Sequence, residues 1–432
     1  MNIWQFVKTI FLSSMLFLVI FAVPVLQIRA QSIDELKTKI TGRASEIEAL
    51  EKEIAQYQIQ LNGIGEEKQS LQKEIKTIDL TRKKLAADIK LTENKIESSS
   101  LTIEKLELEI GDKKTNITNK IEVIKETIRK INEIDDNTLV ELVLSSDNIS
   151  EFWNDVENFE QFQESINKNV KELQDLKTRL EENKASIEIA RANSIALRAK
   201  LQDQKIIADN SRNQKNQLLA QTKNKEANYQ KALDEKLRLK EEFEKELLKF
   251  ESELRIAIDP GSFPPAGTGV LLWPLKDIFI TQKFGNTDFA QSGGYNGKGH
   301  NGVDFRASIG TEIKAALSGV VEATGNTDQY PGCYSYGKWV LIKHNNGLST
   351  LYAHLSLIKA IEGQQVSTGD IVGYSGNTGY STGPHLHLTV YASQGVQVTR
   401  LGAIAGRPIS KCSSASIPIA PLPAYLNPLD YL

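Results

Sequence analysis

Isoleucine and leucine recur with a seven-residue period through the first part of this chain. With Ile33 placed at heptad position a, isoleucine returns to that position as far as Ile131, and position d is hydrophobic at most heptads from Leu36 to Ile134. A hydrophobic repeat of 3.5 residues keeps one seam of a helix facing a partner helix. The pattern therefore predicts a long α-helical coiled coil.

A second, weaker heptad rhythm follows a break near residues 135–150 and extends toward residue 258. Two helical segments of similar length around a short break favour an antiparallel hairpin. Isoleucine at a with leucine at d favours instead a parallel two-stranded homodimer, so both arrangements stay open. We call residues 31–258 the helical arm. From Ser32 to Asp259 it contains no proline, cysteine or histidine, and we assign no chemistry to it.

The N-terminus indicates export from the cytoplasm. Lys8 precedes an apolar stretch from Ile10 to Leu26, and the phrase that ends at Ala30 follows. This order is typical of a secretory signal cleaved after Ala30, and the stretch is also near the lower length limit for a membrane anchor. Under either interpretation of residues 1–30, the remainder of the chain is secreted, periplasmic or anchored at the outer face of the cytoplasmic membrane.

The texture of the sequence changes after the arm. Residues 259–269 are rich in proline and glycine, which end a helix and mark a linker. Residues 270–395 consist of short β-rich runs separated by glycine, and residues 396–432 form a proline-containing extension. The predicted architecture is therefore multidomain, α followed by β, with a compact and mainly antiparallel β-sheet domain at 270–395.

The candidate chemistry lies in that β-rich domain. All 5 histidines of the chain follow residue 299. His300 and Asp304 are close in sequence, and His385 and His387 are two apart, so their side chains share one face of a strand. A catalytic zinc site takes about three protein ligands and leaves one position for water. This pattern, with His354 near the end of another run, predicts a zinc-dependent hydrolase. The formal net charge of −3 gives no indication of nucleic-acid binding.

The phrases around these residues resemble those of the lysostaphin/LytM-type zinc metallopeptidases over about residues 270–395. The similar phrases are Gln282–Gly285, His300–Asp304, Tyr352–Leu355 and Gly376–His387. The resemblance implies an endopeptidase that cleaves cross-links or stem peptides of bacterial peptidoglycan. It also implies that His300, Asp304 and His387 bind Zn²⁺ and that His354 and His385 are the catalytic pair.

The arm has a resemblance of its own. Residues 139–152 and their flanking coils are similar to the hairpin of murein hydrolase activators, whose C-terminal domain is LytM-like. This implies an arm that regulates or positions the enzyme during wall remodelling or cell separation, through a membrane division complex or a cell-wall amidase. An arm that covers the groove until a membrane partner displaces it is a third interpretation. The alternative from another functional class is a non-enzymatic activator of separate amidases, but the complete set of site residues favours an enzyme.

Four details depart from the family pattern or stay open. Leu388 and Thr389 replace the usual aromatic and acidic residues, which puts substrate contacts along that strand in doubt, but not the metal site. The segment 326–337 is longer than usual and is expected to shape the rim of the cleft. Cys333 and Cys412 either form a disulfide or remain two thiols. His344 precedes a hairpin-turn phrase, and we interpret it as structural or as a contact at the cleft edge.

Overall fold

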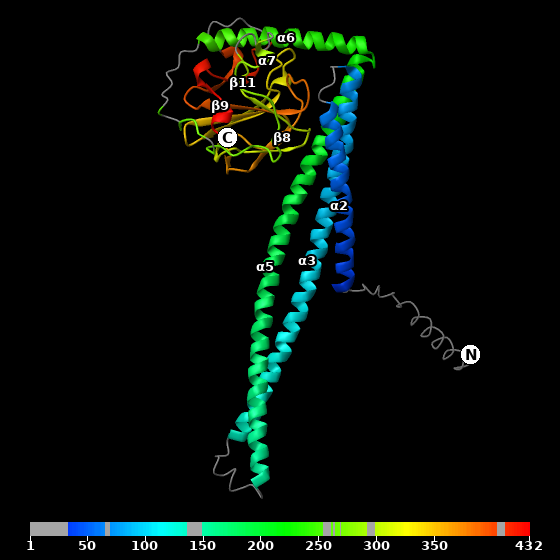
Figure 1. The fold of residues 1–432 in the computed structure, drawn as a ribbon, viewed down its shortest axis with the longest axis vertical. Coiled ribbons are helices and arrows are strands. Elements are labelled where there is room, and N and C mark those ends of the chain that lie inside the picture. The colour runs from blue at the N-terminus through cyan, green and yellow to red at the C-terminus, as the bar shows by residue number, and fades with distance from the viewer. Residues whose placement is uncertain are drawn as a thin grey trace, which may run out of the picture. The chain divides into compact units, whose positions relative to one another are not determined.

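The structure is a computed structural model, and it describes residues 33–64, 70–135, 149–253, 261, 264–267, 269–291, 299–403 and 411–432 (Figure 1). The predicted signal or anchor at 1–30 lies outside the described residues, as does the predicted break over 136–148. The chain divides into two compact units, one with residues up to 43 and 98–192, the other with 44–97 and 193–432. Among the described residues, no helix is long and apolar enough to cross a membrane.

Long helices precede a sheet, which confirms the predicted fold class. The four long helices of the described chain are α2 (Ile33–Ile64), α3 (Leu71–Asp135), α5 (Ile149–Thr222) and α6 (Glu226–Glu253). The heptad pattern predicted a break near 135–150 and a weaker rhythm before residue 233, and the helices also end at Ile64 and at Thr222. After Thr222, Lys223 and Asn224 have φ angles of 49° and 54°. This left-handed conformation ends a helix, and a heptad count does not detect it.

In the unit that contains residues 98–192, α3 and α5 run in opposite directions. Ser99 Oγ donates a hydrogen bond to Ala190 O at 3.1 Å near one end of the pair. Lys120 forms an ion pair with Glu172 farther along. Residues later in α3 thus contact residues earlier in α5, as in an antiparallel helical hairpin. Within this unit the partner of α3 is a segment of the same chain.

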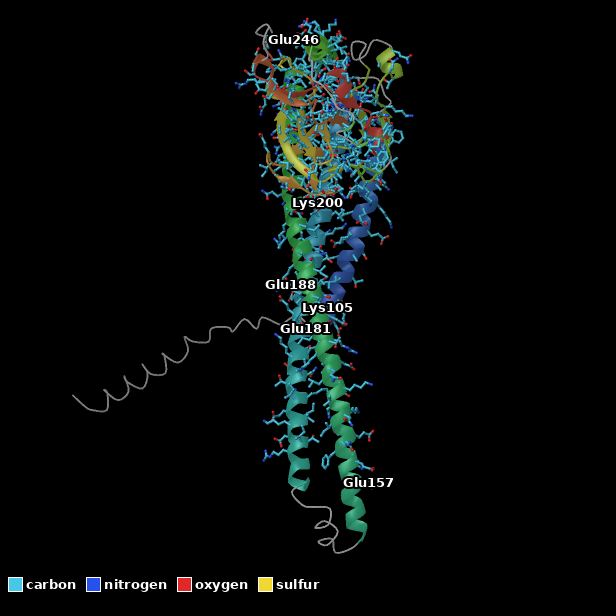
Figure 2. All side chains as sticks on the ribbon, turned by 90° about the vertical axis from the view of Figure 1, so that its left-hand side faces the viewer. Lys105, Glu157, Glu181, Glu188, Lys200 and Glu246 are labelled. Atoms are coloured by element: carbon cyan, nitrogen blue, oxygen red, sulfur yellow. A yellow bond between two sulfur atoms is a disulfide. The ribbon has the colours of Figure 1, made fainter. Side chains whose placement is uncertain are left out.

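The exposed faces of these two helices are charged. Figure 2 shows side chains such as Lys105 and Glu181 along them, and Glu181 pairs with Lys184 at 2.6 Å. Exposed pairs of this kind contribute only about 0.3–0.5 kcal/mol each, so they do not hold the helices together. Hydrophobic side chains on the inner face do so, because Leu180 and Ile187 of the second heptad rhythm are buried.

In the other unit, the helices contact the β-domain through a small hydrophobic cluster. Leu85 of α3 and Ile207 of α5 pack with Ile309 and Tyr374 of the β-domain. The Tyr374 hydroxyl also donates to Asp203 Oδ2 at 2.8 Å. Full burial of a large apolar side chain contributes roughly 1.5–3 kcal/mol, so this cluster fixes the helices against the domain more firmly than surface ion pairs would.

The β-domain is built around one antiparallel sheet. Its strands up to residue 395 are β1 (Ile280–Gln282), β2 (Val303–Arg306), β3 (Glu312–Lys314), β4 (Gly319–Asn326), β5 (Lys338–His344), β6 (Leu348–Ile358), β7 (Gln365–Val366), β8 (Ile371–Ser375) and β9 (His385–Ala392), with the short helix α7 (Asp288–Gln291) after β1. The main order is β1-β2-β9-β6-β5-β4-β7, and β8 pairs with β6 and β3. Leu386, Leu388 and Val390 of β9 are fully buried in the core. The sheet matches the predicted antiparallel domain.

The extension after residue 395 folds onto this domain. Strands β10 (Gln397–Arg400) and β11 (Ser416–Ile419) form a two-stranded sheet, and β12 (Tyr425–Leu426) pairs with β9 of the main sheet. Cys333 and Cys412 form a disulfide that joins the segment 326–337 to the extension. Phe243 and Leu247 of α6 pack on the cluster that contains both cysteines. The disulfide therefore lies beneath α6.

Replacing both cysteines by alanine should lower the free energy of unfolding of this unit. The bond spans a sequence separation of 79, and closing a loop of that length contributes roughly 4 kcal/mol in the chain-entropy model. Urea unfolding followed by tryptophan fluorescence would measure the loss. A reducing agent should destabilise the parent chain and leave the Cys333→Ala/Cys412→Ala variant unchanged. Equal sensitivity of the two chains to the reductant would contradict this account.

Candidate metal centre

Two neighbouring strands bring an aspartate and a histidine face to face. Asp304 on β2 lies directly opposite His387 on β9 in the antiparallel register. His300 precedes β2 and is held by an isolated bridge to Gly285. His387 Nδ1 lies 2.8 Å from Asp304 Oδ1 and 3.1 Å from His300 Nε2. The three buried side chains form a group whose ligand atoms lie within 4.8 Å of one another and could hold a metal ion.

The outward-facing ring nitrogens of both histidines are hydrogen-bonded. His300 Nδ1 lies 2.9 Å from the carbonyl oxygen of Lys283, and His387 Nε2 lies 2.9 Å from Thr389 Oγ1. A carbonyl oxygen only accepts, so Nδ1 of His300 donates and its Nε2 lone pair points inward. If His387 donates to Thr389 in the same way, its Nδ1 lone pair also points inward. Two inward nitrogens and one carboxylate oxygen suit a divalent metal, and such outer hydrogen bonds orient metal-bound histidines.

The carboxyl group at the centre of this set is held in its ionised form. Burial disfavours the charge on Asp304, but the nearby side chains of His385, His300 and His387 outweigh it. Together they hold the pKa of Asp304 well below its usual range. Asp304 is therefore a carboxylate at neutral pH, as a metal ligand must be.

The two predicted catalytic histidines lie beside this group. The rings of His354 and His385 have centroids 4.6 Å apart, and His385 Nε2 lies 3.7 Å from Asp304 Oδ1. Nδ1 of His354 donates to Thr378 O at 2.8 Å, and Nδ1 of His385 donates to Gly383 O at 2.8 Å. In both rings Nε2 is therefore the nitrogen that is left to accept a proton when the ring is neutral.

His354 is held in an uncommon backbone conformation. Its φ angle is 60°, in the left-handed region that residues other than glycine rarely adopt. The backbone N–H of His354 donates to Tyr336 O at 2.8 Å, which helps to hold this geometry. Burial, with the nearby His385 and His387, lowers the pKa of His354 well below its ordinary value. The ring is therefore neutral, and residues in strained conformations are concentrated at functional sites.

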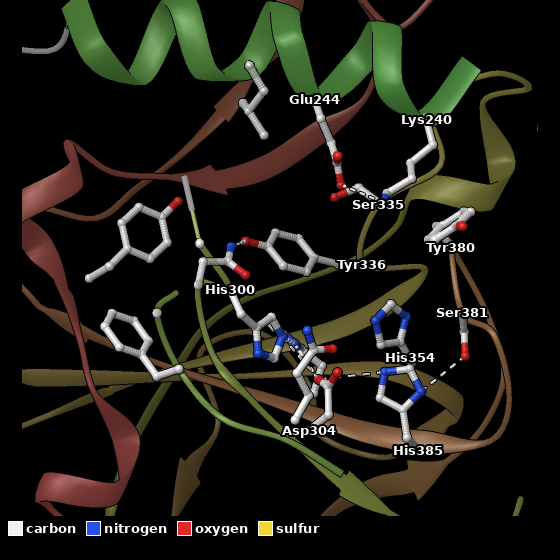
Figure 3. Close-up of a pocket in the computed structure, with 18 of the residues that line it drawn as sticks. Lys240, Glu244, His300, Asp304, Ser335, Tyr336, His354, Tyr380, Ser381 and His385 are labelled. Atoms are coloured by element: carbon white, nitrogen blue, oxygen red, sulfur yellow. Dashed lines mark hydrogen bonds and ion pairs between the residues drawn. The ribbon is translucent and has the colours of Figure 1, made fainter. Parts of the chain in front are cut away.

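The five residues open into one cleft of about 360 Å³. Figure 3 shows His300 and Asp304 on one side and His354, His385 and Ser381 on the other. Further lining residues come from phrases that the sequence had singled out, namely Gln282, Phe284 and Gly285, and from the segment 326–337, namely Ser335 and Tyr336. The structure thus brings all five predicted site residues together, and it places the end of the longer segment at the cleft as expected.

Sequence reasoning missed two contributions to the cleft. Tyr336 accepts a hydrogen bond from Asn301 Nδ2 at 2.8 Å, and its ring centroid lies 5.9 Å from that of His387. Lys240 and Glu244 of α6 also line the cleft, at 3.3 Å from each other (Figure 3). Nothing in the heptad pattern distinguishes these charged residues from others on the arm. Only the fold shows that α6 borders the cleft.

The substitutions on β9 do not act as expected. Leu388 and Thr389 were expected to affect substrate contacts and not the metal site, but both side chains are fully buried. Leu388 packs in the core, and Thr389 bonds to the ring of His387. Thr389, which departs from the family pattern, therefore contacts the candidate metal ligand His387. His344 lies apart from the cleft, buried and hydrogen-bonded through Nδ1 to Ser318 O and through Nε2 to Thr350.

Two histidines and an aspartate that could hold a metal ion, with two further histidines beside them in one cleft, suit metal-dependent hydrolysis. Comparison with known families agrees, because residues 298–399 match Peptidase family M23. The C-terminal region of the chain therefore contains an M23 peptidase domain of the LytM/lysostaphin type.

Several curated proteins are similar to this region. The chain is 44% identical over 88 residues to the DD-carboxypeptidase/endopeptidase Mpg of Neisseria meningitidis serogroup B (20% of this chain, 19% of Mpg). It is 41% identical over 121 residues to the peptidoglycan DD-endopeptidase ShyA of Vibrio cholerae (28% and 24%). The chain thus spans about a fifth to a quarter of the length of these relatives. The catalytic domain of lysostaphin from Staphylococcus simulans is 31% identical, with 34% of this chain and 90% of that domain covered and a TM-score of 0.24.

Removing the hydroxyl of Thr389 should weaken metal binding. Without it the His387 ring loses the partner that orients it, and loss of such a partner typically lowers metal affinity about 10- to 100-fold. Competition titration of Zn²⁺ against a chromophoric chelator would measure this in Thr389→Val. The matched variant Thr389→Ser keeps the hydroxyl and should retain near-parental affinity. Equal affinity in Thr389→Val and the parent would rule out this role.

Mild acid should destabilise the domain through His344. Burial lowers the pKa of His344 below its ordinary value of 6.5, so below pH 6.5 the unfolded chain binds a proton that the folded chain excludes. The stability contributed by the neutral ring is complete above pH 6.5 and is lost as the pH falls through the folded value. The urea midpoint, measured with chelator present, should fall between pH 7.5 and 5.5. His344→Gln should reduce this dependence without abolishing it, because burial lowers the pKa of His354 as well, and an unchanged slope would count against a role of His344.

Proposed function

We propose that the chain is a zinc-dependent endopeptidase that hydrolyses cross-links or stem peptides of bacterial peptidoglycan. The observation that carries this proposal is the convergence of His300, Asp304 and His387 in one cleft, with His354 and His385 beside them. In it, the first three residues bind zinc and the last two are the catalytic pair. The match to a peptidase family supports peptide-bond hydrolysis as the reaction, and the geometry of the site supports these five residues as the ones that carry it out.

The donor set supports zinc in particular. Two imidazole nitrogens and one carboxylate oxygen form a frequent three-ligand set of catalytic zinc, which leaves a further position open toward the cleft. Zinc bound there would lower the pKa of a water ligand to about 7 and polarise a peptide carbonyl. The low pKa of Asp304 keeps that ligand ionised without any change in protonation.

The two remaining histidines can move the protons of the reaction. Hydrolysis forms a bond between the water oxygen and the carbonyl carbon and breaks the carbon–nitrogen bond. A neutral Nε2 on His354 or His385 can accept the proton of the attacking water and later deliver a proton to the leaving amine. The buried and neutral His354 suits the accepting role, or it donates to the developing oxyanion once it is protonated.

The names of the relatives support the substrate class and the compartment. Mpg is a DD-carboxypeptidase/endopeptidase and ShyA is a peptidoglycan DD-endopeptidase. We infer a peptidoglycan peptide as the substrate here, and hence a location outside the cytoplasm. The predicted signal or anchor at 1–30 agrees with that location. The helical arm would then position or regulate the enzyme at the wall, through a membrane division complex or an amidase.

The purified chain should bind about one equivalent of zinc and release peptides from isolated sacculi. His300→Ala should lose both properties, because it removes a ligand. His354→Ala should keep its zinc and lose roughly 100-fold or more of its rate, the usual contribution of a proton-transferring group. Metal analysis and mass spectrometry of the released fragments would measure the two effects. Glu362→Ala, in an exposed turn, is the control and should match the parent.

The opposite result would favour the non-enzymatic alternative. A zinc-loaded chain that releases nothing from any sacculus, yet accelerates a purified cell-wall amidase, would identify an activator. In that case His354→Ala should stimulate the amidase as well as the parent does.

A further inference from the structure

The loop between β8 and β9 orients the ring of His354. We call residues 376–384 the cleft loop. Its Thr378 O accepts the hydrogen bond from His354 Nδ1 at 2.8 Å, and the hydroxyl of Thr378 donates to Leu355 O at 2.8 Å. Figure 3 shows Tyr380 of this loop and His354 among the residues that line the cleft. The ring nitrogen of His354 that faces the cleft therefore depends on the position of the cleft loop.

The segment 326–337 has a shape set by its own hydrogen bonds. Its ends are joined, because the backbone N–H of Thr327 donates to Gly337 O and the N–H of Gly337 donates to Thr327 Oγ1, both at 2.9 Å. Asn326 caps the short turn that follows it and accepts from the N–H of Asp328 at 3.1 Å. The disulfide at Cys333 ties the segment to the C-terminal extension. The segment can therefore hold a neighbouring loop in a fixed place.

The neighbour that it holds is the cleft loop. The carboxylate of Asp328 accepts a hydrogen bond from the N–H of Gly379, which lies 2.9 Å from Oδ2 and 3.0 Å from Oδ1. Ser335 O accepts from the N–H of Tyr380 at 2.9 Å. The two backbones are so close that a Cβ on Gly379, whose φ is 71°, would overlap Ser335 O. Asp328 is exposed, but Gly379 is buried and its N–H needs this acceptor.

One peptide unit links Asp328 to the candidate catalytic ring. The carbonyl of Thr378 and the N–H of Gly379 belong to the same planar peptide group. Asp328 binds the N–H end of this group, and His354 Nδ1 binds the carbonyl end. A chain of hydrogen bonds thus runs from a carboxylate through a peptide to an imidazole, and each bond in such a chain polarises the next.

The same segment also binds the backbone of His354. The N–H of His354 donates to Tyr336 O at 2.8 Å, at the residue whose φ is 60°. Segment 326–337 therefore holds His354 in two ways, directly through Tyr336 and by way of the peptide that Asp328 binds. A group that transfers protons must be placed to within a fraction of an ångström, so both contacts matter for catalysis.

We propose that Asp328 is a positioning residue for His354 and acts through the peptide group between Thr378 and Gly379. This inference rests on the proposed function, in which His354 transfers protons. Asp328 itself contacts neither substrate nor zinc in this account. The disulfide-bonded segment 326–337 is then a support for the catalytic geometry, in addition to its place at the rim of the cleft.

A second effect of Asp328 must be separated from this one. Burial lowers the pKa of Lys236 and of Lys338, and the negative charge of Asp328 opposes that shift in both. Loss of the charge could therefore alter the segment through these lysines. Asp328→Asn separates the two effects, because it removes the charge and keeps an oxygen that can accept from Gly379.

The test measures kcat and KM of the zinc-loaded full chain with soluble, cross-linked fragments of sacculi. Asp328→Ala should lower kcat about tenfold with KM within about twofold, because a misplaced proton-transferring group weakens the transition state and not substrate binding. Asp328→Asn should stay within about threefold of the parent. Gln329→Ala, exposed in the same turn, is the matched control and should equal the parent. Zinc content should be that of the parent in all three variants.

A double variant tests whether the effect passes through His354. In the His354→Ala background, Asp328→Ala should lower kcat by less than about twofold, since the ring through which it acts is absent. Three outcomes would overturn the proposal: parental kcat in Asp328→Ala, equal losses in Asp328→Ala and Asp328→Asn, and the full tenfold loss in the His354→Ala background. If circular dichroism shows that Asp328→Ala does not fold, Asp328→Ser replaces it, because its hydroxyl is one atom too short to reach Gly379.

A measurement without substrate keeps this inference distinct from the proposed function. In chains labelled with nitrogen-15 histidine, the ring N–H of His354 should be observed in the parent and in Asp328→Asn, and should be broadened by exchange with water in Asp328→Ala. The His354→Ala variant assigns the signal. A parent that cleaves nothing would reject the proposed function, and an unchanged ring signal in Asp328→Ala would reject the positioning role.

Discussion

The register between β2 and β9 is the constraint on which the site depends. It sets Asp304 opposite His387 and Arg306 opposite His385. Side chains alternate between the faces of a strand, so a slip of one residue would turn both histidines of β9 away from Asp304. The opposite face of β9 prevents such a slip, because Leu386 and Leu388 are fully buried. Hydrophobic packing on one face thus determines the chemistry on the other.

Hydrogen bonding completes what the register begins. Four imidazole rings are crowded around one carboxylate, and each has an outer partner that is a backbone carbonyl or a hydroxyl. These partners decide which nitrogen of each ring faces inward. Hydrogen bonds also stabilise the unusual φ angle of His354. Its backbone N–H donates to Tyr336 O, and its ring Nδ1 donates to Thr378 O. The site is organised by the protein before any ligand arrives.

Much of this organisation could be predicted from the sequence. Local periodicity was sufficient for the long helices, and the spacing of His385 and His387 placed both on one face of β9. Contacts between segments far apart in the sequence could not be predicted from local periodicity or spacing. The heptad rhythm runs through the helix end at Ile64 and only weakens in the stretch that contains Thr222, and no pattern distinguishes Lys240 as a residue that borders the cleft. Thr389 departs from the family pattern, and its hydroxyl is hydrogen-bonded to the ring of His387. The sequence did not show this bond, so the departure was expected to affect substrate contacts and not the metal site.

The residues that line the cleft come both from the region that matches known relatives and from other parts of this chain. The matched region, residues 298–399, contains all five histidines and Asp304. The cleft is also lined by residues from outside this region, among them Lys240 on α6 and Tyr425 in the extension. Binding energy from such remote contacts determines which substrate reaches the transition state. Similarity in the matched region therefore supports the reaction type, whereas α6 and the extension place further side chains in the cleft, where binding energy of that kind can arise.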